Sequence, residues 1–175
     1  NTSPTGLAQT LGHVTWNCAS QSATVSLTQT LTTVNGNLSI LGTNSQILAL
    51  GSTAALTLNV LGDLNVSGTS ILSLNSGAFV TTLNLSGNYN QTAGTVTSSA
   101  TNQIINFAGT NPARTYTQSG GTLSNNSFTY NVNLAAFLTL NNSISVATGK
   151  VFTVNGTLYC GTNLINGAGT FTLAS

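Results

Sequence analysis

Apolar residues alternate with polar ones along much of this chain, and a period of two is typical of strands that bury one face. From Leu56 to Val66 every second residue is apolar or glycine. The runs Leu138–Val146 and Phe152–Cys160 follow the same rule, with Asn142 and Gly156 at their centres. Nothing comparable repeats at helical spacing. The sequence therefore predicts an all-β protein.

A nine-residue phrase recurs within these runs, with apolar residues on both sides of a central Gly or Asn. Copies are centred on Gly36, Gly62 and Gly87, which gives nearly equal intervals along the chain. An interval of this length suits one three-sided turn of a parallel β-solenoid (β-helix). Asn142 and Gly156 are too close in the chain to be a full turn apart, so we expect them on different sides of the coil. We predict about seven irregular coils, right-handed because parallel crossovers nearly always are.

Charged side chains are almost absent, since Asp63, Arg114 and Lys150 are the only ones in 175 residues. A charge repeated at the same position of each coil would face its copies at about 4.8 Å and repel them. Thr, Ser and Asn stack without that penalty and can form hydrogen-bonded ladders. The same scarcity removes most acid–base, ion-pair and metal chemistry. We therefore expect no enzyme, no catalytic residue, no metal site and no cofactor.

The partners that this composition favours are also limited. A net charge of +1 without basic clusters lacks the phosphate attraction on which nucleic-acid binding depends. No apolar run is long enough to cross a bilayer as a helix. We expect neither nucleic-acid binding nor membrane insertion.

The segment around His13, Trp16 and Cys18 holds the only cluster of chemically distinctive side chains. A His near a Cys suggests a nucleophile pair or a metal site. No carboxylate is near in sequence and there is no second His, so we favour an apolar plug at the start of the solenoid. The predicted organisation is an N-terminal cap or first coil over residues 1–24 and continuous solenoid repeats over residues 25–175, as a piece of a longer chain.

Cys18 and Cys160 lie near opposite ends of the chain and are thus separated by several coils. A disulfide tolerates Cα separations of only about 4.4–6.8 Å. We therefore expect no internal bond, and Cys160, at an inward position, is expected to act as a small apolar filler.

The three charged residues suggest no site. Asp63 follows Gly62 in a turn-like phrase, but calcium takes six or more oxygens and this chain has one side-chain carboxylate. Arg114 follows Asn111-Pro112, where a solvated loop is expected. Lys150 follows Gly149 at another expected corner.

Asn-x-Ser/Thr triplets follow largely from composition and predict possible glycans outside the inward face; they begin at Asn1, Asn37, Asn65, Asn84, Asn90, Asn125, Asn141 and Asn155.

Three phrases carry a resemblance to a known family: Tyr116–Leu123, Phe152–Cys160 and Asn166–Leu173. They resemble the β-strand repeats of giant secreted surface proteins of Bacteroidota, many of them adhesins exported by the type IX route. The resemblance covers most of residues 25–175. It implies an extracellular or cell-surface location and brings no catalytic motif. The C-terminal sorting domain of that export route is absent from this segment.

Two functions are open at this point. The first is a structural segment of an extracellular fibre, stalk or adhesin, which self-associates or stacks on neighbouring repeats of the same chain. The second is a binding module for polysaccharide or ice that uses Thr- and Asn-rich faces. Thr-x-Thr triplets begin at Thr30, Thr95, Thr115 and Thr170, but the intervals between them are unequal and fit no single period. A continuous Thr array is therefore not expected.

Overall fold

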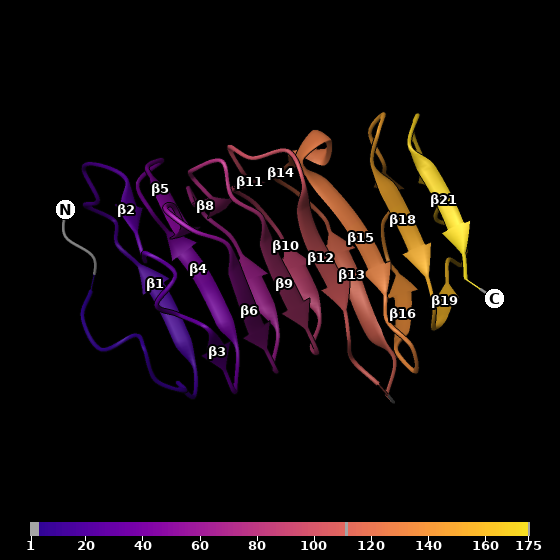
Figure 1. The fold of residues 1–175 in the computed structure, drawn as a ribbon, viewed down its shortest axis with the longest axis horizontal. Helices are drawn as coiled ribbons and strands as arrows, with labels where there is room; N and C mark the ends of the chain where they lie inside the picture. The colour runs from indigo at the N-terminus through magenta and orange to yellow at the C-terminus, as the bar shows by residue number, and fades with distance from the viewer. Residues whose placement is uncertain (1–3, 111, 175) are drawn as a thin grey trace.

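Three parallel β-sheets wind around one apolar interior in the computed structural model, which describes residues 4–110 and 112–174. Figure 1 shows the strands of successive turns side by side along the long axis, with the two termini at opposite ends. All recorded strand pairs are parallel, as a coil that advances by one strand per turn requires. The predicted parallel β-solenoid is confirmed.

We number the sheets I, II and III in the order in which the chain enters them. Sheet I contains β1 (Val14–Asn17), β4 (Leu38–Gly42), β7 (Leu64–Val66), β10 (Tyr89–Gln91), β13 (Arg114–Gln118), β16 (Phe137–Leu140) and β19 (Thr157–Tyr159). Sheet II contains β2 (Val25–Ser26), β5 (Ile47–Gly51), β8 (Ile71–Asn75), β11 (Thr95–Thr97) and β14 (Thr122–Leu123). Sheet III contains β3 (Thr33–Val34), β6 (Leu56–Val60), β9 (Thr81–Leu85), β12 (Gln103–Phe107), β15 (Phe128–Val132), β18 (Val151–Val154) and β21 (Thr170–Leu173).

The remaining elements lie between strands of these sheets. A short 3₁₀ helix, η1 (Asn125–Ser127), precedes β15, and β17 (Ile144–Ser145) pairs with β20 (Ile165–Asn166) between sheets I and III in the last turns. The solenoid has about six turns. This is close to the seven expected from length, because the first strand begins only at Val14.

The nine-residue phrase corresponds to a strand of sheet III, a corner and a strand of sheet I. In the copy centred on Gly62, β6 supplies the first apolar residues and β7 supplies the last. Asn142 lies between β16 and β17, whereas Gly156 lies between β18 and β19. The prediction that these two residues occupy different sides of the coil is confirmed.

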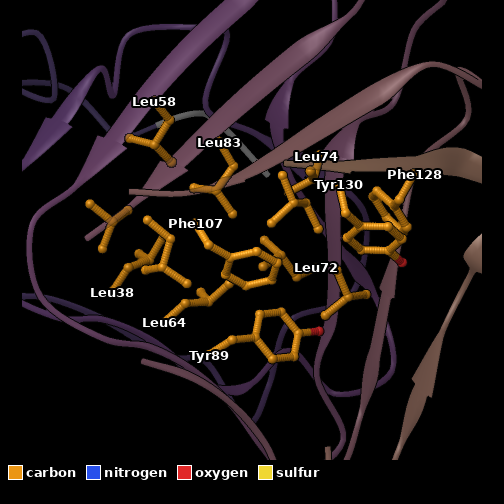
Figure 2. Packing of buried hydrophobic residues seen from close by; sticks show 14 of the residues in the cluster. Leu38, Leu58, Leu64, Leu72, Leu74, Leu83, Tyr89, Phe107, Phe128 and Tyr130 are labelled. Carbon is orange, nitrogen blue, oxygen red and sulfur yellow. The ribbon is translucent and has the colours of Figure 1, made fainter. Parts of the chain in front are cut away.

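Inward side chains from all three sheets form one continuous core. Figure 2 shows Leu58 and Leu83 of sheet III, Leu72 of sheet II, and Leu64 and Tyr89 of sheet I around a shared interior. Because equivalent positions lie one above the other, like packs on like along the axis. The core therefore consists of columns of similar side chains.

Aromatic residues fill two of these columns in the second half of the chain. Tyr89 stacks on Tyr116 with ring centroids 5.0 Å apart, and Tyr130 stacks on Phe152 at 5.7 Å. Phe107 meets Tyr116 edge to face at 6.3 Å and links sheet III to sheet I. Such pairs contribute about 0.5–1.5 kcal/mol beyond their buried area.

Glycines stack at the corner between sheets III and I. The amide N–H of Gly62 donates to the carbonyl oxygen of Gly36 over 3.0 Å, and Gly87 lies on Gly62 in the next turn. A Cβ at Gly62 or at Gly87 would collide with the backbone of the glycine in the preceding turn. Gly12 begins this column, and a Cβ there would meet nothing within 4 Å. The central glycines are therefore required by close backbone contact.

Gly62→Ala is expected to lower the free energy of unfolding by about 1–3 kcal/mol, because the new methyl forces the backbones of two turns apart. Gly12→Ala in the same column should change it by less than about 0.5 kcal/mol. Chemical denaturation followed by far-UV circular dichroism measures both values. Equal losses in the two variants would contradict the close-contact explanation.

Candidate functional site

Side chains of the N-terminal cluster take part in packing and hydrogen bonds in the first turns. Trp16 lies in β1 and packs against the core, and its indole N–H donates to Oε1 of the buried Gln21 at 3.0 Å. Gln21 in turn donates to the carbonyl oxygens of Ala23 and Ile47, which joins the first two turns. Leu11 also packs on the core and forms a bridge to Val34. These contacts agree with the prediction of an apolar plug around Trp16.

His13 and Asp63 belong to one hydrogen-bonded column at the corner between sheets III and I. In each turn a side-chain acceptor receives the backbone N–H of the next turn. His13 Nδ1 accepts from Asn37 at 3.0 Å, and Asn37 Oδ1 accepts from Asp63 at 2.9 Å. Asp63 Oδ1 accepts from Asn88 at 2.7 Å, and Asn88 Oδ1 accepts from Thr115 at 2.9 Å. We call these five residues the corner ladder.

The corner ladder explains the one acidic residue. Asp63 Oδ1 also accepts from the side-chain amide of Asn88 at 3.0 Å, so it occupies a position that amides fill in the neighbouring turns. A carboxylate satisfies the same two donors as a carbonyl oxygen. Asp63 therefore acts as a backbone acceptor in the corner. Within the described residues no group of three His, Cys, Asp or Glu side chains is placed to hold a metal ion.

Lys150 lies at a corner, as predicted, but its side chain is almost fully buried, with 6% exposed. Its Nζ donates to the carbonyl oxygen of Thr101 and, at 2.9 Å, to Oδ1 of Asn102. These residues belong to the turn before the preceding one, so the side chain passes the intervening turn. Lys150 thereby ties three successive turns together at this corner.

The prediction that Arg114 is a solvated loop charge is wrong. Arg114 is the first residue of β13 and pairs with Leu138, which extends sheet I further toward the Asn111-Pro112 turn than the Pro-based prediction allowed. The side chain is half-buried, its aliphatic part lies against Gly109, and its Nε is buried without a hydrogen-bond partner. Strand pairing therefore overrides the local turn signal. Asn111 itself lies outside the described residues.

Both cysteines are free, as expected from their separation. Cys18 follows β1 in the first turn and Cys160 follows β19 in the last. Cys160 is partly buried and packs against the core, which confirms its predicted role as an apolar filler.

Polar groups inside the coil are paired with one another. The buried Tyr89 donates its hydroxyl to Oε1 of Gln91 at 2.8 Å, and Tyr116 repeats this contact with Gln118 at 2.6 Å. Gln91 Nε2 donates to the carbonyl oxygens of Gly94 and Thr122, which secures the next corner. Burial raises the pKa of Tyr89, Tyr116 and Tyr130 well above the usual value of a tyrosine. These hydroxyls therefore serve as neutral donors inside the fold.

The outward face of sheet III carries the most regular array of polar groups. Nδ2 of Asn84 donates to Oδ1 of Asn59 at 2.8 Å, Asn106 donates to Asn84 at 2.7 Å, and Asn131 donates to Asn106 at 2.8 Å. Thr153 and Thr172 continue this column in register. We call it the amide column. It confirms the expected Asn ladder.

A second column runs beside the amide column, two residues earlier on each strand. Its members are all β-branched and follow one another in strand register: Thr57, Thr82, Ile104, Thr129, Val151 and Thr170. We call it the β-branched column. Residues two apart on a strand point to the same face, so both columns face outward. Each residue of the two columns is half-buried or exposed.

The Thr-x-Thr triplets do not form this face. Thr95 belongs to sheet II, Thr115 to sheet I and Thr170 to sheet III, while Thr30 precedes β3. The expectation that these triplets build no continuous array is therefore confirmed. The face that does repeat reads Thr-Leu-Asn in β6 and β9 and Thr-Tyr-Asn in β15.

Several predicted glycan acceptors are already engaged. Nδ2 of Asn84 and of Asn90 each donates along a ladder, as do those of Asn65 and Asn141. A sugar would replace one of the two N–H bonds of the amide, so the other would have to serve the ladder. The triplet at Asn1 lies outside the described residues.

The chain matches no family model, no curated protein and no solved structure. Over residues 4–110 and 112–174, no helix has the length and apolar character needed to span a membrane.

Asp63→Asn is expected to keep the free energy of unfolding within about 0.5 kcal/mol of the original, because the amide oxygen can still accept from Asn88. Asp63→Ala should lower it by about 1–3 kcal/mol, since two donors lose their acceptor. Denaturant unfolding of the two variants measures the difference. Equal destabilisation by both substitutions would show that the charge of Asp63, rather than its acceptor atom, is what the corner needs.

The buried tyrosines predict a loss of stability in alkali. A phenol whose pKa is raised by folding stabilises the native state below its unfolded pKa of about 10, and that contribution falls as pH rises further. Three such groups should remove about 4 kcal/mol of unfolding free energy by one pH unit above that value. Tyr116→Phe should reduce the pH slope by about one third, whereas Tyr159→Phe removes an exposed phenol and serves as the control. Denaturation at several pH values measures the slope, and a flat profile above a pH of about 10 would contradict this account.

Proposed function

We propose that this chain is a structural segment of an extracellular surface fibre, stalk or adhesin, without catalytic activity. The observation that supports the proposal best is the continuous stack of in-register parallel turns, closed by ladders on its outside and columns of apolar residues on its inside. Such a coil grows in length by adding turns without any change of cross-section. It suits a protein whose task is to span a distance.

The side-chain chemistry supports the same proposal. Buried polar side chains join turns: Gln21 and Gln91 bond to the next turn, and Lys150 bonds to the turn before the preceding one. Two of the three charged side chains are used in a similar way, Asp63 in the corner ladder and Lys150 across three turns. Side chains of the kind that an enzyme would place in a cleft here form hydrogen bonds between turns.

The C-terminal end of the coil supports association with another coil. Strand β21 is exposed along its whole length, and Phe171 and Leu173 are 47% and 71% exposed. Leu158, Cys160 and Ile165 of the same end are only partly buried. An open parallel edge with apolar side chains is a template for a further strand. We infer that further repeats of the same chain or a second copy cover this end.

The surface location in this proposal comes from the resemblance to the β-strand repeats of secreted Bacteroidota surface proteins. Extended adhesins present a terminal binding domain at a distance from the cell, and a rigid coil of variable length serves that purpose. The phrases Phe152–Cys160 and Asn166–Leu173 that carry the resemblance form the last turns of the solenoid.

The purified chain is expected to self-associate as its concentration rises, because the apolar C-terminal end is open. Size-exclusion chromatography with light scattering measures the mass across a concentration series, and electron cryo-microscopy should show rods with a layer spacing of about 4.8 Å. The double variant Phe171→Lys/Leu173→Lys should remain monomeric. Leu134→Lys is the matched control, since Leu134 is 83% exposed at a corner on the side of the rod.

Two results would contradict the proposal. A well-folded monomer whose mass does not change with concentration would remove the self-association. An antibody that labels only lysed cells, and never intact ones, would remove the extracellular location.

A further inference from the structure

The outward face of sheet III combines two columns, of which the amide column joins one turn to the next through side-chain hydrogen bonds. The amide column forms a ladder in which Asn84 and Asn106 each make one donor and one acceptor contact, and each has a second N–H and a second lone pair. The β-branched column takes no part in that ladder, whose hydrogen bonds join asparagine side chains. It nevertheless keeps one β-branched residue in each of six turns.

The two columns are stiff as well as regular. β-Branched side chains are restricted at χ1, so their γ-methyl groups project from the strand in few directions. The asparagines are held by ladder bonds of 2.7–2.8 Å. A surface with little rotamer freedom loses little entropy when a ligand orders it. The face is thus preorganised for a ligand that repeats with the same period.

The period and the chemistry of the face fit ordered water. Turns repeat at about 4.7–4.9 Å along the axis. Hydrogen-bonded water oxygens roughly 2.75 Å apart in a tetrahedral network place second neighbours about 4.5 Å apart. Each step of the water row differs from each step of the turns by about 0.2–0.4 Å, so the two rows match over a few neighbouring turns. The methyl groups order the water beside them, and the spare amide and hydroxyl groups hydrogen-bond that layer.

The lack of charged and aromatic side chains on this face favours ice over other ligands with a regular repeat. Neither column contains an ionisable side chain, since Asp63 lies in the corner ladder, Arg114 in sheet I and Lys150 at a different corner. An uncharged face is complementary to the uncharged lattice of ice and not to an ionic mineral. Neither column contains an aromatic side chain that could stack on a sugar ring. We propose that the outward face of sheet III binds ice.

Ice affinity tests this proposal directly. The purified chain is frozen slowly from dilute solution on a cold surface, and the protein in the ice is compared with that left in the liquid. The original chain should be enriched in the ice and should slow recrystallisation. Thr82→Tyr and Thr129→Tyr place a ring in the middle of the face and should each reduce the ice-bound fraction about tenfold, because the ring lifts the neighbouring turns from the lattice.

Thr139→Tyr is the matched control. Thr139 is a half-buried, outward threonine of β16 in sheet I, so the same substitution is made on a different face. Circular dichroism checks that all three variants keep the strand content of the original chain. The control should bind ice within about twofold of the original chain.

The outcomes are distinct. Enrichment in ice that is lost in both sheet III variants and kept in the control supports the proposal. Exclusion of the original chain from ice overturns it, and so does equal binding by all variants. Binding to crystalline cellulose or chitin that depends on Thr82, without binding to ice, would assign the face to polysaccharide and also overturn it. None of these readouts depends on self-association, so the structural role and the ice-binding role can fail separately.

Discussion

In-register stacking of equivalent positions at a single short repeat is the constraint on which the rest of the structure depends. Every side chain meets its counterpart in the turns above and below, so a residue is acceptable only if it tolerates a neighbour of its own kind. Asparagine does so by donating and accepting along the ladder, as Asn84 and Asn106 show. Glycine does so at the corner, where Gly62 contacts Gly36 backbone to backbone. A charged side chain does not tolerate a neighbour of its own kind, because like charges repel, and charged residues are therefore scarce.

Two of the three charged residues follow the same constraint. Asp63 replaces an amide in one rung of the corner ladder, and the rungs on either side are neutral. Lys150 turns its ammonium group toward the carbonyl oxygen of Thr101 and the amide of Asn102. In both places a single charge meets dipoles instead of a second charge. An isolated charge is therefore compatible with a stack that would not accept a column of charges.

Much of the fold can be predicted from local pattern, because each nine-residue phrase contains a strand, a corner and a strand. The assignment of Asn142 and Gly156 to different corners also follows from chain distance alone. The strand at Arg114 could not be found this way, since its pairing with Leu138 depends on a neighbouring turn and the adjacent Pro suggested a loop. The burial of Gln91 is likewise visible only once its partners Gly94 and Thr122 are brought together by the coil.

The regular outward face of sheet III could not be recognised from the sequence for a related reason. Turns differ in length, since the chain interval between ladder partners is shorter from Asn84 to Asn106 than from Asn59 to Asn84 or from Asn106 to Asn131. The difference is taken up in the corners, where a residue can be added without disturbing strand register, so an irregular sequence repeat produces a regular surface. Periodicity of a solenoid face must therefore be sought in the strand register and not in the sequence interval. On that basis sheet III differs from sheet I, where Arg114 begins a strand and Tyr159 ends the row of Thr115 and Thr139. Sheet III keeps uncharged, non-aromatic residues in both columns throughout, although strand formation alone would have accepted a Tyr in either.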